Sequence, residues 1–366
     1  MPTPANYPIL AYDTQSQLLA DTPAANTYGV VIQDTNLGLE LNGYYFYNGS
    51  SWALPHTPFA SFQQDLPFFG GTPSARLLQV KAQESVSVCD FGAGTTADDT
   101  SAFQSAVLAL APSGGDLIVP YNPNGYFVGD DAIVLDSSVN FGVHVIIQGG
   151  TVINYTGSTG KVITIAANVL STAPKHRITG GVFQAQTPGS GTCIWIEDCG
   201  SHVIENVQAY GFEKAFAIHN HLHYSEHNTF MNCRAIGGKF AWWLSMDPGA
   251  VRSMATTTWI ACSAAPDTNS PTTPPNVWYG LFIDSNVSIY RANFDGLTLF
   301  PATDYAVGMA CNGSISSARG KLNCEDNSGG TAAHTAGILL GPDATGFSGH
   351  DISSDLRGVT DNYVQS

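Results

Sequence analysis

The sequence predicts an all-β protein, a right-handed parallel β-helix (solenoid) preceded by a small N-terminal β module. Charged residues make up only 11% of the chain, about half the share of an average globular protein, which disfavours long charged helices. Short segments with large apolar residues at their first and third positions recur along residues 163–340, at intervals typical of one solenoid turn. A compact aromatic block precedes them near the N-terminus. We therefore expect two units, residues 1–84 and residues 85–366.

The N-terminal unit is predicted to be a β module followed by a connector. Tyr28–Thr35 and Gly43–Trp52 are rich in β-forming residues, and Asn48-Gly49 within the second stretch is a strong hairpin signal. Pro55–Gly71 is rich in Pro, Phe and Gly, so we expect it to connect the two units. The hairpin resembles small modules of phage tail proteins. This resemblance implies that residues 1–84 attach the protein to a virion.

A capping helix near residues 99–111 is predicted to open the second unit. Asp98 or Asp99 can cap its first turn, and apolar residues follow at helical spacing from Phe103 to Leu110. Leu117–Val119 then begins a buried strand. The order of motifs resembles the start of pectate-lyase-like right-handed parallel β-helices, which occur in phage tailspikes and in polysaccharide-degrading enzymes. The motifs are Asp90-Phe-Gly-Ala, Asp98-Asp-Thr, Ala102-Phe-Gln-Ser-Ala-Val, Gly115-x-Leu-x-Val-Pro and Gly125-Tyr-Phe.

The remaining chain is predicted to form the rungs of the solenoid. Alternation places the first and third positions of each segment in the core and the second, fourth and sixth on the outer face. The seven segments begin at Ile163, Ile194, Phe216, Trp242, Leu281, Val307 and Ile338. A second series of core positions follows them in phase, and its members are Ile178, Ile204, Phe230, Trp259, Tyr290, Ile315 and Ile352.

Aromatic residues at the second position of consecutive rungs predict a carbohydrate-binding surface. Trp195, Trp243 and Phe282 would form an exposed ladder, and flat exposed aromatic rings are surfaces on which sugar rings stack. The alternative is that a loop or a neighbouring subunit covers these rings. The long insertion Ser263–Tyr279, which contains Trp278, is expected to form one wall of a groove beside them.

Ionisable residues at the fourth and sixth positions of the middle rungs are the candidate catalytic groups. The Cα atoms of Asp247 and Asp284 are expected to lie roughly 8 Å apart, given the spacing of parallel strands. This separation suits an inverting glycosidase, with Asp284 as base and Asp247 as acid. Glu197 is a reserve for either role, and His219 lies one rung away from it. The alternative is that these acids are turn residues, since Asp247 precedes the turn signal Pro248-Gly249.

We predict no metal and no cofactor. His219 and His221 share a face, but a pair with strand spacing has no defined third ligand in the sequence. No GxSxG motif, Walker loop or dinucleotide-binding glycine motif in a βαβ setting is present. The seven cysteines have no metal-site or disulfide-framework spacing, so we expect them to be reduced and mostly buried.

Charge and hydropathy exclude several classes of partner. The net charge of −16 repels nucleic acid and offers no basic patch to an anionic membrane surface. The chain has no apolar run of about 18 residues, so we expect no membrane span. It begins with no basic segment followed by an apolar one, so we expect no signal peptide. We therefore expect synthesis in a host cytoplasm.

The resemblance implies a phage tailspike or tail fibre, located in the virion tail and typically a homotrimer. Its partners would be a virion tail or baseplate protein, bound by the N-terminal module, and bacterial surface polysaccharide (capsule or O-antigen). We expect a polysaccharide depolymerase, with a glycoside hydrolase favoured over a lyase because Arg234 and Arg291 lie away from the carboxylates. The alternatives are a non-catalytic receptor-binding or structural tail protein and a free bacterial pectate-lyase-like enzyme.

Overall fold

The protein is described by a computed structural model that divides into two compact units, Met1–Ala82 and Gln83–Ser366. Residues 85–325 are described with gaps at 96, 112, 137–141, 168–174, 252 and 274–275, followed by residues 336–341. For residues 9–12, 27–31, 43–47, 52–53, 351–357 and 361–365, the backbone alone is described. The predicted hairpin tip, Asn48-Gly49, and the connector Pro55–Gly71 lie outside the described residues.

The described part of the N-terminal unit is a four-stranded sheet. Its strands are β1 (Ile9–Tyr12), β2 (Thr27–Val31), β3 (Gly43–Tyr47) and β4 (Trp52–Ala53). β1 pairs with β2 in parallel, whereas β2 with β3 and β3 with β4 pair antiparallel. The β3–β4 pair corresponds to the two arms of the predicted hairpin.

A short helix covers the start of the second unit, as the apolar spacing predicts. After β5 (Ser85–Ser87) and the 3₁₀ turn Val88–Phe91, helix α4 runs from Thr100 to Leu110 and buries its predicted apolar face. The two candidate caps, Asp98 and Asp99, accept hydrogen bonds from different backbone groups. Asp98 accepts the backbone N–H of Thr100 at 2.9 Å, whereas Asp99 accepts N–H groups of Gly94 and Phe127 and so ties the helix start to the strand β7 (Tyr126–Val128).

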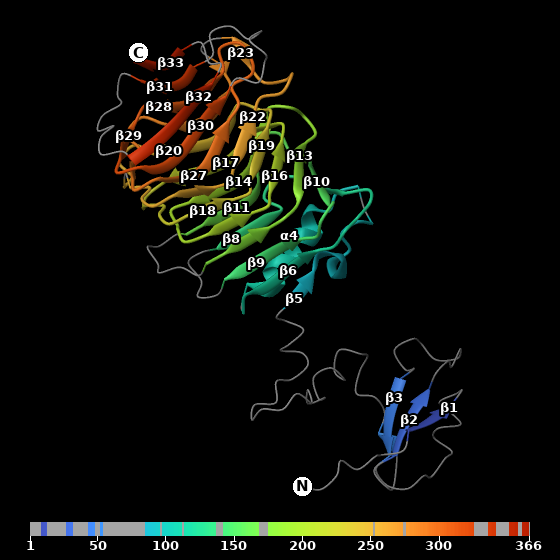
Figure 1. The fold of residues 1–366 in the computed structure, drawn as a ribbon. Helices are drawn as coiled ribbons and strands as arrows, with labels where there is room; N and C mark the ends of the chain where they lie inside the picture. Colours follow the sequence, from blue (N-terminus) through green and yellow to red (C-terminus); the bar gives the residue numbers. More distant parts are fainter. Residues whose placement is uncertain are drawn as a thin grey trace. The chain divides into compact units, whose positions relative to one another are not determined.

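The second unit is a parallel β-solenoid, as predicted. In Figure 1 its strands stack in chain order from the helix α4 to the red C-terminal strands. A 16-stranded sheet winds through it, and all strand pairs described in that sheet are parallel. Besides β5, its strands are β6 (Gly115–Val119), β7 (Tyr126–Val128), β9 (Val143–Ile147), β10 (Val152–Tyr155), β12 (Arg177–Thr179), β13 (Val182–Ala185), β15 (Val203–Glu205), β16 (Gln208–Tyr210), β18 (Thr229–Met231), β19 (Arg234–Ile236), β21 (Thr258–Ile260), β22 (Ser263–Ala265), β27 (Asn293–Leu299), β30 (Arg319–Glu325) and β32 (Asp351–Arg357).

A nine-stranded parallel sheet forms another face of the solenoid, and it carries the predicted rung segments. Its strands are β8 (Ile133–Asp136), β11 (Lys161–Ala166), β14 (Ser190–Glu197), β17 (Phe212–Asn220), β20 (Phe240–Met246), β25 (Tyr279–Ile283), β28 (Val307–Cys311), β31 (Ala336–Leu340) and β33 (Asp361–Gln365). Two small pairs complete the described strands. They are the antiparallel β23 (Thr272–Thr273) with β24 (Asn276–Val277), and the parallel β26 (Ser288–Tyr290) with β29 (Ser314–Ser316).

The strand register confirms six of the seven predicted rung starts, and one is wrong. Leu281 pairs with Met309, not with Val307, and Met309 pairs with Ile338. The prediction was therefore two residues out at this rung. A shift of two residues preserves the alternation of inward and outward side chains, so the hydrophobic pattern could not reveal it.

The second core series is confirmed from Ile178 to Trp259 and then fails at two positions. Trp259 pairs with Phe294, which in turn pairs with Gly320. Tyr290 lies instead in β26, where it pairs with Ser316 and is 43% exposed. Ile315 belongs to β29 of the same small pair. The extra short pair inserts residues between two rungs, and these residues carry the apolar pattern of a rung of their own.

Aromatic stacks run through the core along the solenoid axis. The rings of Phe216 and Trp242 stack at 5.5 Å, and those of Trp259 and Phe294 stack at 5.2 Å. All four side chains are fully buried. Each ring thus packs on the ring of the neighbouring rung, which is why large apolar residues recur at these positions.

Six of the seven cysteines are buried and all are free, whereas Cys89 is exposed.

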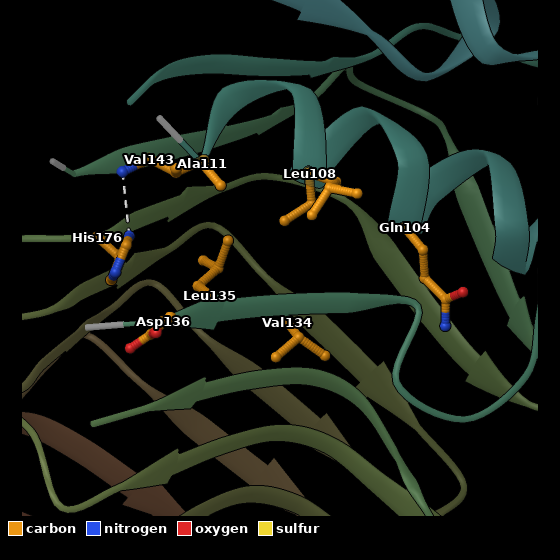
Figure 2. A pocket seen from close by; sticks show the side chains of 9 residues that line it. Gln104, Leu108, Ala111, Val134, Leu135, Asp136, Val143 and His176 are labelled. Carbon is orange, nitrogen blue, oxygen red and sulfur yellow. Dashed lines mark hydrogen bonds between the residues drawn. The ribbon is translucent and has the colours of Figure 1, made fainter. Parts of the chain in front are cut away.

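A column of buried polar side chains holds the backbone at the starts of β9, β12 and β15. His176 Nδ1 accepts the backbone N–H of Val143 at 3.0 Å, which is the dashed line in Figure 2. His202 Nδ1 accepts the N–H of His176 at 3.1 Å, and Asn228 Oδ1 accepts the N–H of His202 at 3.2 Å. Burial lowers the pKa of His176 to about 4 and that of His202 to about 3. Both imidazoles are therefore neutral acceptors at neutral pH.

A column of small residues lies next to the core on the nine-stranded sheet. Each member stands just before a core residue of its strand, and its side chain shrinks along the chain. The column consists of Val162, Cys193, Ala215, Ala241, Gly280 and Gly308. At Gly280 an added Cβ would crowd the side chain of Leu299, and at Gly308 it would crowd the thiol of Cys324. Glycine is required there because the carbonyl oxygens of Gly308 and Gly337, on the next strands of the sheet, would also lie only 2.5 Å and 2.7 Å from the added Cβ atoms.

Candidate functional site

The outer face of the nine-stranded sheet carries two columns that contain the predicted site residues. The register places Trp195, Ala217, Trp243 and Phe282 in one column. The column beside it holds Glu197, His219 and Ser245 on the consecutive strands β14, β17 and β20. Because neighbouring strands lie about 4.8 Å apart, side chains of one column are within contact distance of each other.

Trp195 is less exposed than the sequence pattern predicted. Its residue exposure is only 9%, because Lys161 Nζ lies 4.1 Å above the ring and the rings of His219 and Trp243 pack against it. Its indole N–H donates to Glu197 Oε2 at 2.8 Å. Trp195 therefore supports Glu197 and Lys161 and presents little free ring surface. The predicted exposed ladder is wrong at this position, because alternation fixes the face of a side chain but not what covers it.

Trp243 and Phe282 are the half-buried rings of the column. Lys214 Nζ lies 4.7 Å from the centre of the Trp243 ring. Phe282 packs against Phe240 and Tyr279, with ring centres at 5.1 Å and 4.9 Å. Together these aromatic groups form a partly exposed apolar patch beside the polar column, with Trp243 next to the candidate site.

Trp278 does not belong to this surface. The residue is 0% exposed and packs in the core, so the prediction that it lines a groove is wrong. The insertion that contains it forms the small β23–β24 hairpin. Trp278 follows that hairpin directly and leads into β25, where it is covered by the solenoid itself. The sequence position inside a long insertion suggested exposure, but the insertion ends one residue earlier, at Val277.

His219 packs against both tryptophans, whose own ring centres lie 5.8 Å apart. Its ring centre lies 5.0 Å from that of Trp195 and 6.3 Å from that of Trp243, the latter nearly parallel at 12°. Its Nδ1 lies 2.8 Å from Ser245 Oγ. Ser245 is only 2% exposed, so its hydroxyl orients the imidazole and does not face an external substrate. Burial lowers the pKa of His219, although Asp247 acts in the opposite direction.

Asp247 bridges two histidines. One carboxylate oxygen lies 2.6 Å from His221 Nδ1, and the other lies 3.4 Å from His219 Nε2. The hydrogen bond from His221 lowers the pKa of Asp247, and the same bond raises the pKa of His221. Asp247 is therefore an ionised carboxylate. It is poorly suited to donate a proton, which was the role that the sequence interpretation gave it.

Asp198 is a structural member of the site that sequence reasoning missed. The residue is 6% exposed and has a positive φ of 55°. Its Oδ1 accepts the backbone N–H groups of His221, Leu222 and His223 at 2.7 Å, 3.1 Å and 2.9 Å. The carboxylate thereby fixes the loop that carries His221. Its only sequence signal was its position next to Glu197 at a strand end.

Asp284 occupies a turn at the end of β25. Its Oδ1 accepts the backbone N–H of Ser285 at 2.8 Å, and its carbonyl accepts the N–H of Val287. Its own N–H donates to the carbonyl of Leu244. These contacts are those of a turn residue. Asp284 lies one strand from Ser245, whereas the side chain of Asp247 points to the histidines of the preceding strand.

The face also carries cations that sequence reasoning overlooked. Lys161 and Lys214 lie over the rings of Trp195 and Trp243. The expectation of few cations near the carboxylates considered only Arg234 and Arg291, and these two lysines contradict it. Both lysines stand near the starts of β11 and β17, before the repeated segments that were aligned. The site thus combines carboxylates, imidazoles and ammonium groups beside a partly exposed tryptophan.

The sequence showed no third ligand-type group to join His219 and His221, but in the structure Asp247 lies beside both. Ligand-type atoms of His219, His221 and Asp247 all lie within 4.8 Å of one another. The third member comes from the neighbouring rung, and sequence spacing within one strand could not reveal it.

A separate pocket lies at the start of the solenoid, between α4 and β8 (Figure 2). Apolar side chains make up most of its lining. Two of them, Leu108 and Val134, are 74% and 45% exposed. The lining residues are Gln104, Val107, Leu108, Ala111, Val134, Leu135, Asp136, Val143 and His176. None of the predicted site residues is among them.

Among the described residues, no helix is long and apolar enough to cross a membrane.

No family model matches the chain, and no curated protein matches it in sequence. Solved structures match it at low similarity. The enzymatically active domain of bacteriophage CBA120 tailspike protein 2 has a TM-score of 0.42 and 13% identity, covering 96% of this chain and 52% of that one. Tailspike protein 3 of the same phage has a TM-score of 0.36 and 12% identity, covering 92% of this chain and 75% of that one.

The tailspike protein of Acinetobacter phage vB_ApiP_P1 has a TM-score of 0.40 and 12% identity, covering 93% of this chain and 61% of that one. The parallel pairing of the strands establishes the solenoid independently of these matches. In structure, the chain is similar to phage tailspike proteins with a parallel β-solenoid fold.

Proposed function

We propose that this protein is a tailspike or tail fibre of a virion that binds a host surface polysaccharide on the outer face of β14, β17, β20 and β25. One observation carries the binding proposal. The partly exposed ring of Trp243 lies beside Lys214 and stacks with His219, which lies 3.4 Å from the Asp247 carboxylate. A sugar ring stacked on Trp243 would present its hydroxyl groups to these polar groups. The motifs at residues 90–127 and the N-terminal hairpin support the assignment to a virion.

The same site is proposed to cleave the polysaccharide by glycoside hydrolysis, with the roles of the acids revised. Asp247 is ionised, so it suits the base that takes a proton from the attacking water. Glu197, on the other side of His219, would donate a proton to the leaving glycosidic oxygen. The water oxygen bonds to the anomeric carbon as the glycosidic bond breaks. Asp284 is the second candidate for the base. Asp247 is preferred because the described hydrogen bonds of Asp284 are those of a turn residue.

A lyase is the second candidate, and the two lysines favour it. Elimination from a uronic acid requires a cation to neutralise the sugar carboxylate while a base removes the adjacent proton. Lys161 and Lys214 lie over the rings of Trp195 and Trp243, both of which contact His219, and would supply that cation. In this reaction the base would be His219 or His221. As it takes the proton next to the carboxylate, the glycosidic carbon–oxygen bond to the adjacent ring carbon breaks, the leaving oxygen takes up a proton, and the product carries a carbon–carbon double bond.

The proposal extends to the assembly. The N-terminal unit would bind a tail or baseplate protein, and three copies of the chain would form the spike. A homotrimer would cover solenoid surface that a single chain leaves exposed. A receptor-binding protein without catalytic activity remains the alternative if the face binds polysaccharide and leaves it intact.

The test uses the purified full chain with surface polysaccharides of candidate hosts, and it follows new reducing ends and the absorbance of unsaturated sugar together. Hydrolysis gives reducing ends without the chromophore, whereas elimination gives both. Glu197→Gln and Asp247→Asn are each expected to lower the hydrolysis rate by about 10²- to 10⁴-fold. Asp295→Asn, an exposed acid on β27, is the control and should leave the rate unchanged. Binding without cleavage would assign the protein to adhesion.

A further inference from the structure

Two imidazoles and one carboxylate converge on the outer face of the nine-stranded sheet. We propose that His219, His221 and Asp247 bind a divalent first-row transition-metal ion, of which Zn²⁺ fits best. One ligand atom of each residue lies within 4.8 Å of those of the other two. Atoms bound to one metal ion at about 2.0–2.2 Å lie within such a distance of each other, so a small closure around the ion completes the set.

The three ligands are held in place before any metal arrives. The imidazole of His219 packs against two indole rings, and its Nδ1 is engaged by Ser245 Oγ at 2.8 Å. This leaves Nε2 directed at Asp247. Metal-bound histidines typically have such a partner on the other ring nitrogen, which fixes ring orientation and tautomer. Asp198 fixes the loop of His221 through backbone N–H groups.

The donor set selects the class of ion. Ca²⁺ and Mg²⁺ prefer sites made of oxygen ligands, whereas imidazole nitrogen suits Zn²⁺, Co²⁺, Ni²⁺ and Fe²⁺. Two imidazoles with one carboxylate therefore disfavour the hard cations. Glu197 lies opposite His219 on the neighbouring strand, and Asp198 accepts the backbone N–H of His221, so two further carboxylates stand beside the ligands.

The proposed site is open on one side. The side chains of His221 and Asp247 are 53% and 45% exposed, whereas that of His219 is 12% exposed. Three protein ligands leave room for a water or a sugar oxygen on the ion, which is the arrangement of catalytic rather than structural zinc sites. Metal binding itself does not depend on the proposed function. Its consequence does, because a bound metal would make Asp247 a ligand and leave the activation of water to the ion.

The test measures metal binding directly on the full chain, stripped with a chelator and then titrated with Co²⁺ and Zn²⁺. Visible absorption reports Co²⁺ coordination, and calorimetry reports Zn²⁺ stoichiometry. His221→Ala and Asp247→Asn remove exposed ligands and should each weaken binding by more than about 100-fold, since loss of an outer-shell partner alone costs 10- to 100-fold. Ser245→Ala should weaken it by about 10- to 100-fold. His223→Ala is the matched control, because it lies in the same loop outside the cluster.

One metal ion per chain, lost in His221→Ala and retained in His223→Ala, is the expected result. The proposal is overturned if Zn²⁺ binding is absent, if it persists unchanged in both ligand variants, or if Ca²⁺ or Mg²⁺ competes at equal concentration. The polysaccharide assay is run on stripped and loaded protein in parallel. Specific metal binding without cleavage supports this inference and counts against the enzyme, whereas cleavage by protein that binds no metal supports the enzyme and overturns this inference.

Discussion

The imidazole of His219 lies nearly parallel to the indole of Trp243, with an interplanar angle of 12° and ring centres 6.3 Å apart. This pair joins the partly exposed aromatic surface to the polar cluster, because the same imidazole also contacts Ser245 and Asp247. A ligand stacked on Trp243 would therefore lie beside the groups proposed to act on it.

Removal of the Trp243 ring is expected to weaken polysaccharide binding by about tenfold or more, since a stacked aromatic ring contributes on the order of 1 kcal/mol beyond its buried area. The comparison is Trp243→Ala against Tyr290→Ala, which removes a 43% exposed ring from the separate β26–β29 pair. Affinity is measured by calorimetry with a defined oligosaccharide. Equal affinities of the two variants would show that the binding surface lies elsewhere.

The lysines over the two tryptophans are expected to matter for acidic polysaccharides. Lys214→Gln should weaken binding of a uronic-acid polymer and reduce its dependence on salt, because one ion-pairing charge is lost. Binding of a neutral polymer should change little. Lys321→Gln is the control, because this exposed lysine lies on β30 of the other sheet. If the two variants lose equal affinity for the acidic polymer, the cationic groups of the site are not its recognition element.

Acid is expected to destabilise the solenoid through the buried histidine column. The pKa values of His176 and His202 are about 4 and 3 in the folded protein, whereas histidines of an unfolded chain titrate near 6.5. Their contribution to stability is complete above pH 6.5 and is lost as the pH falls, because only the unfolded state takes up these protons. The loss is roughly 2 kcal/mol for each histidine at pH 5.

Asparagine offers a test of this acid dependence. Asn228 Oδ1 already accepts a backbone N–H in the same column, so His202→Asn keeps an acceptor and removes the titrating group. The variant should lose less stability than the parent protein between pH 7 and pH 5 in denaturant unfolding. An unchanged pH dependence in both His202→Asn and His176→Asn would rule out the column as its source.

The turn between β19 and β20 is expected to tolerate only glycine at position 238. Gly238 has a φ of 69°, and an added Cβ would overlap the carbonyl of Phe212. Gly238→Ala should therefore destabilise the protein by more than about 1 kcal/mol, because conformational strain and a backbone clash add together. Gly149→Ala is the control, since nothing lies within 4 Å of its Cβ. Thermal unfolding of the two variants at pH 7 makes the comparison.

The sequence predicted the solenoid because core positions repeat through many strands, and each repeat adds to the same pattern. It misplaced Val307 because a two-residue shift leaves that pattern intact. It also placed Tyr290 in the core series, since the short β26–β29 pair has an apolar centre of its own. Such errors of register require knowledge of which strands pair, and composition does not provide it.

The candidate site was only partly predictable. The pattern indicated that Glu197, His219 and Trp243 share a face, because strand alternation determines this. It did not indicate that Asp247 turns back to the histidines of the preceding rung. The coverage of Trp195 by Lys161 and the anchoring role of Asp198 were equally invisible, since both arise from contacts between side chains and loops of different turns.

The side chains of the small-residue column decrease in size from Val162 to Gly308, so the turns of the solenoid differ along its axis. The early members of the column fill this position with a side chain, whereas at Gly280 and Gly308 neighbouring carbonyl groups and the side chains of Leu299 and Cys324 already occupy that space. The turns are consequently not interchangeable building blocks. A turn copied from the early part and inserted near β28 would bring a methyl or thiol group against Cys324, so lengthening this solenoid by duplication would require glycine at the copied position.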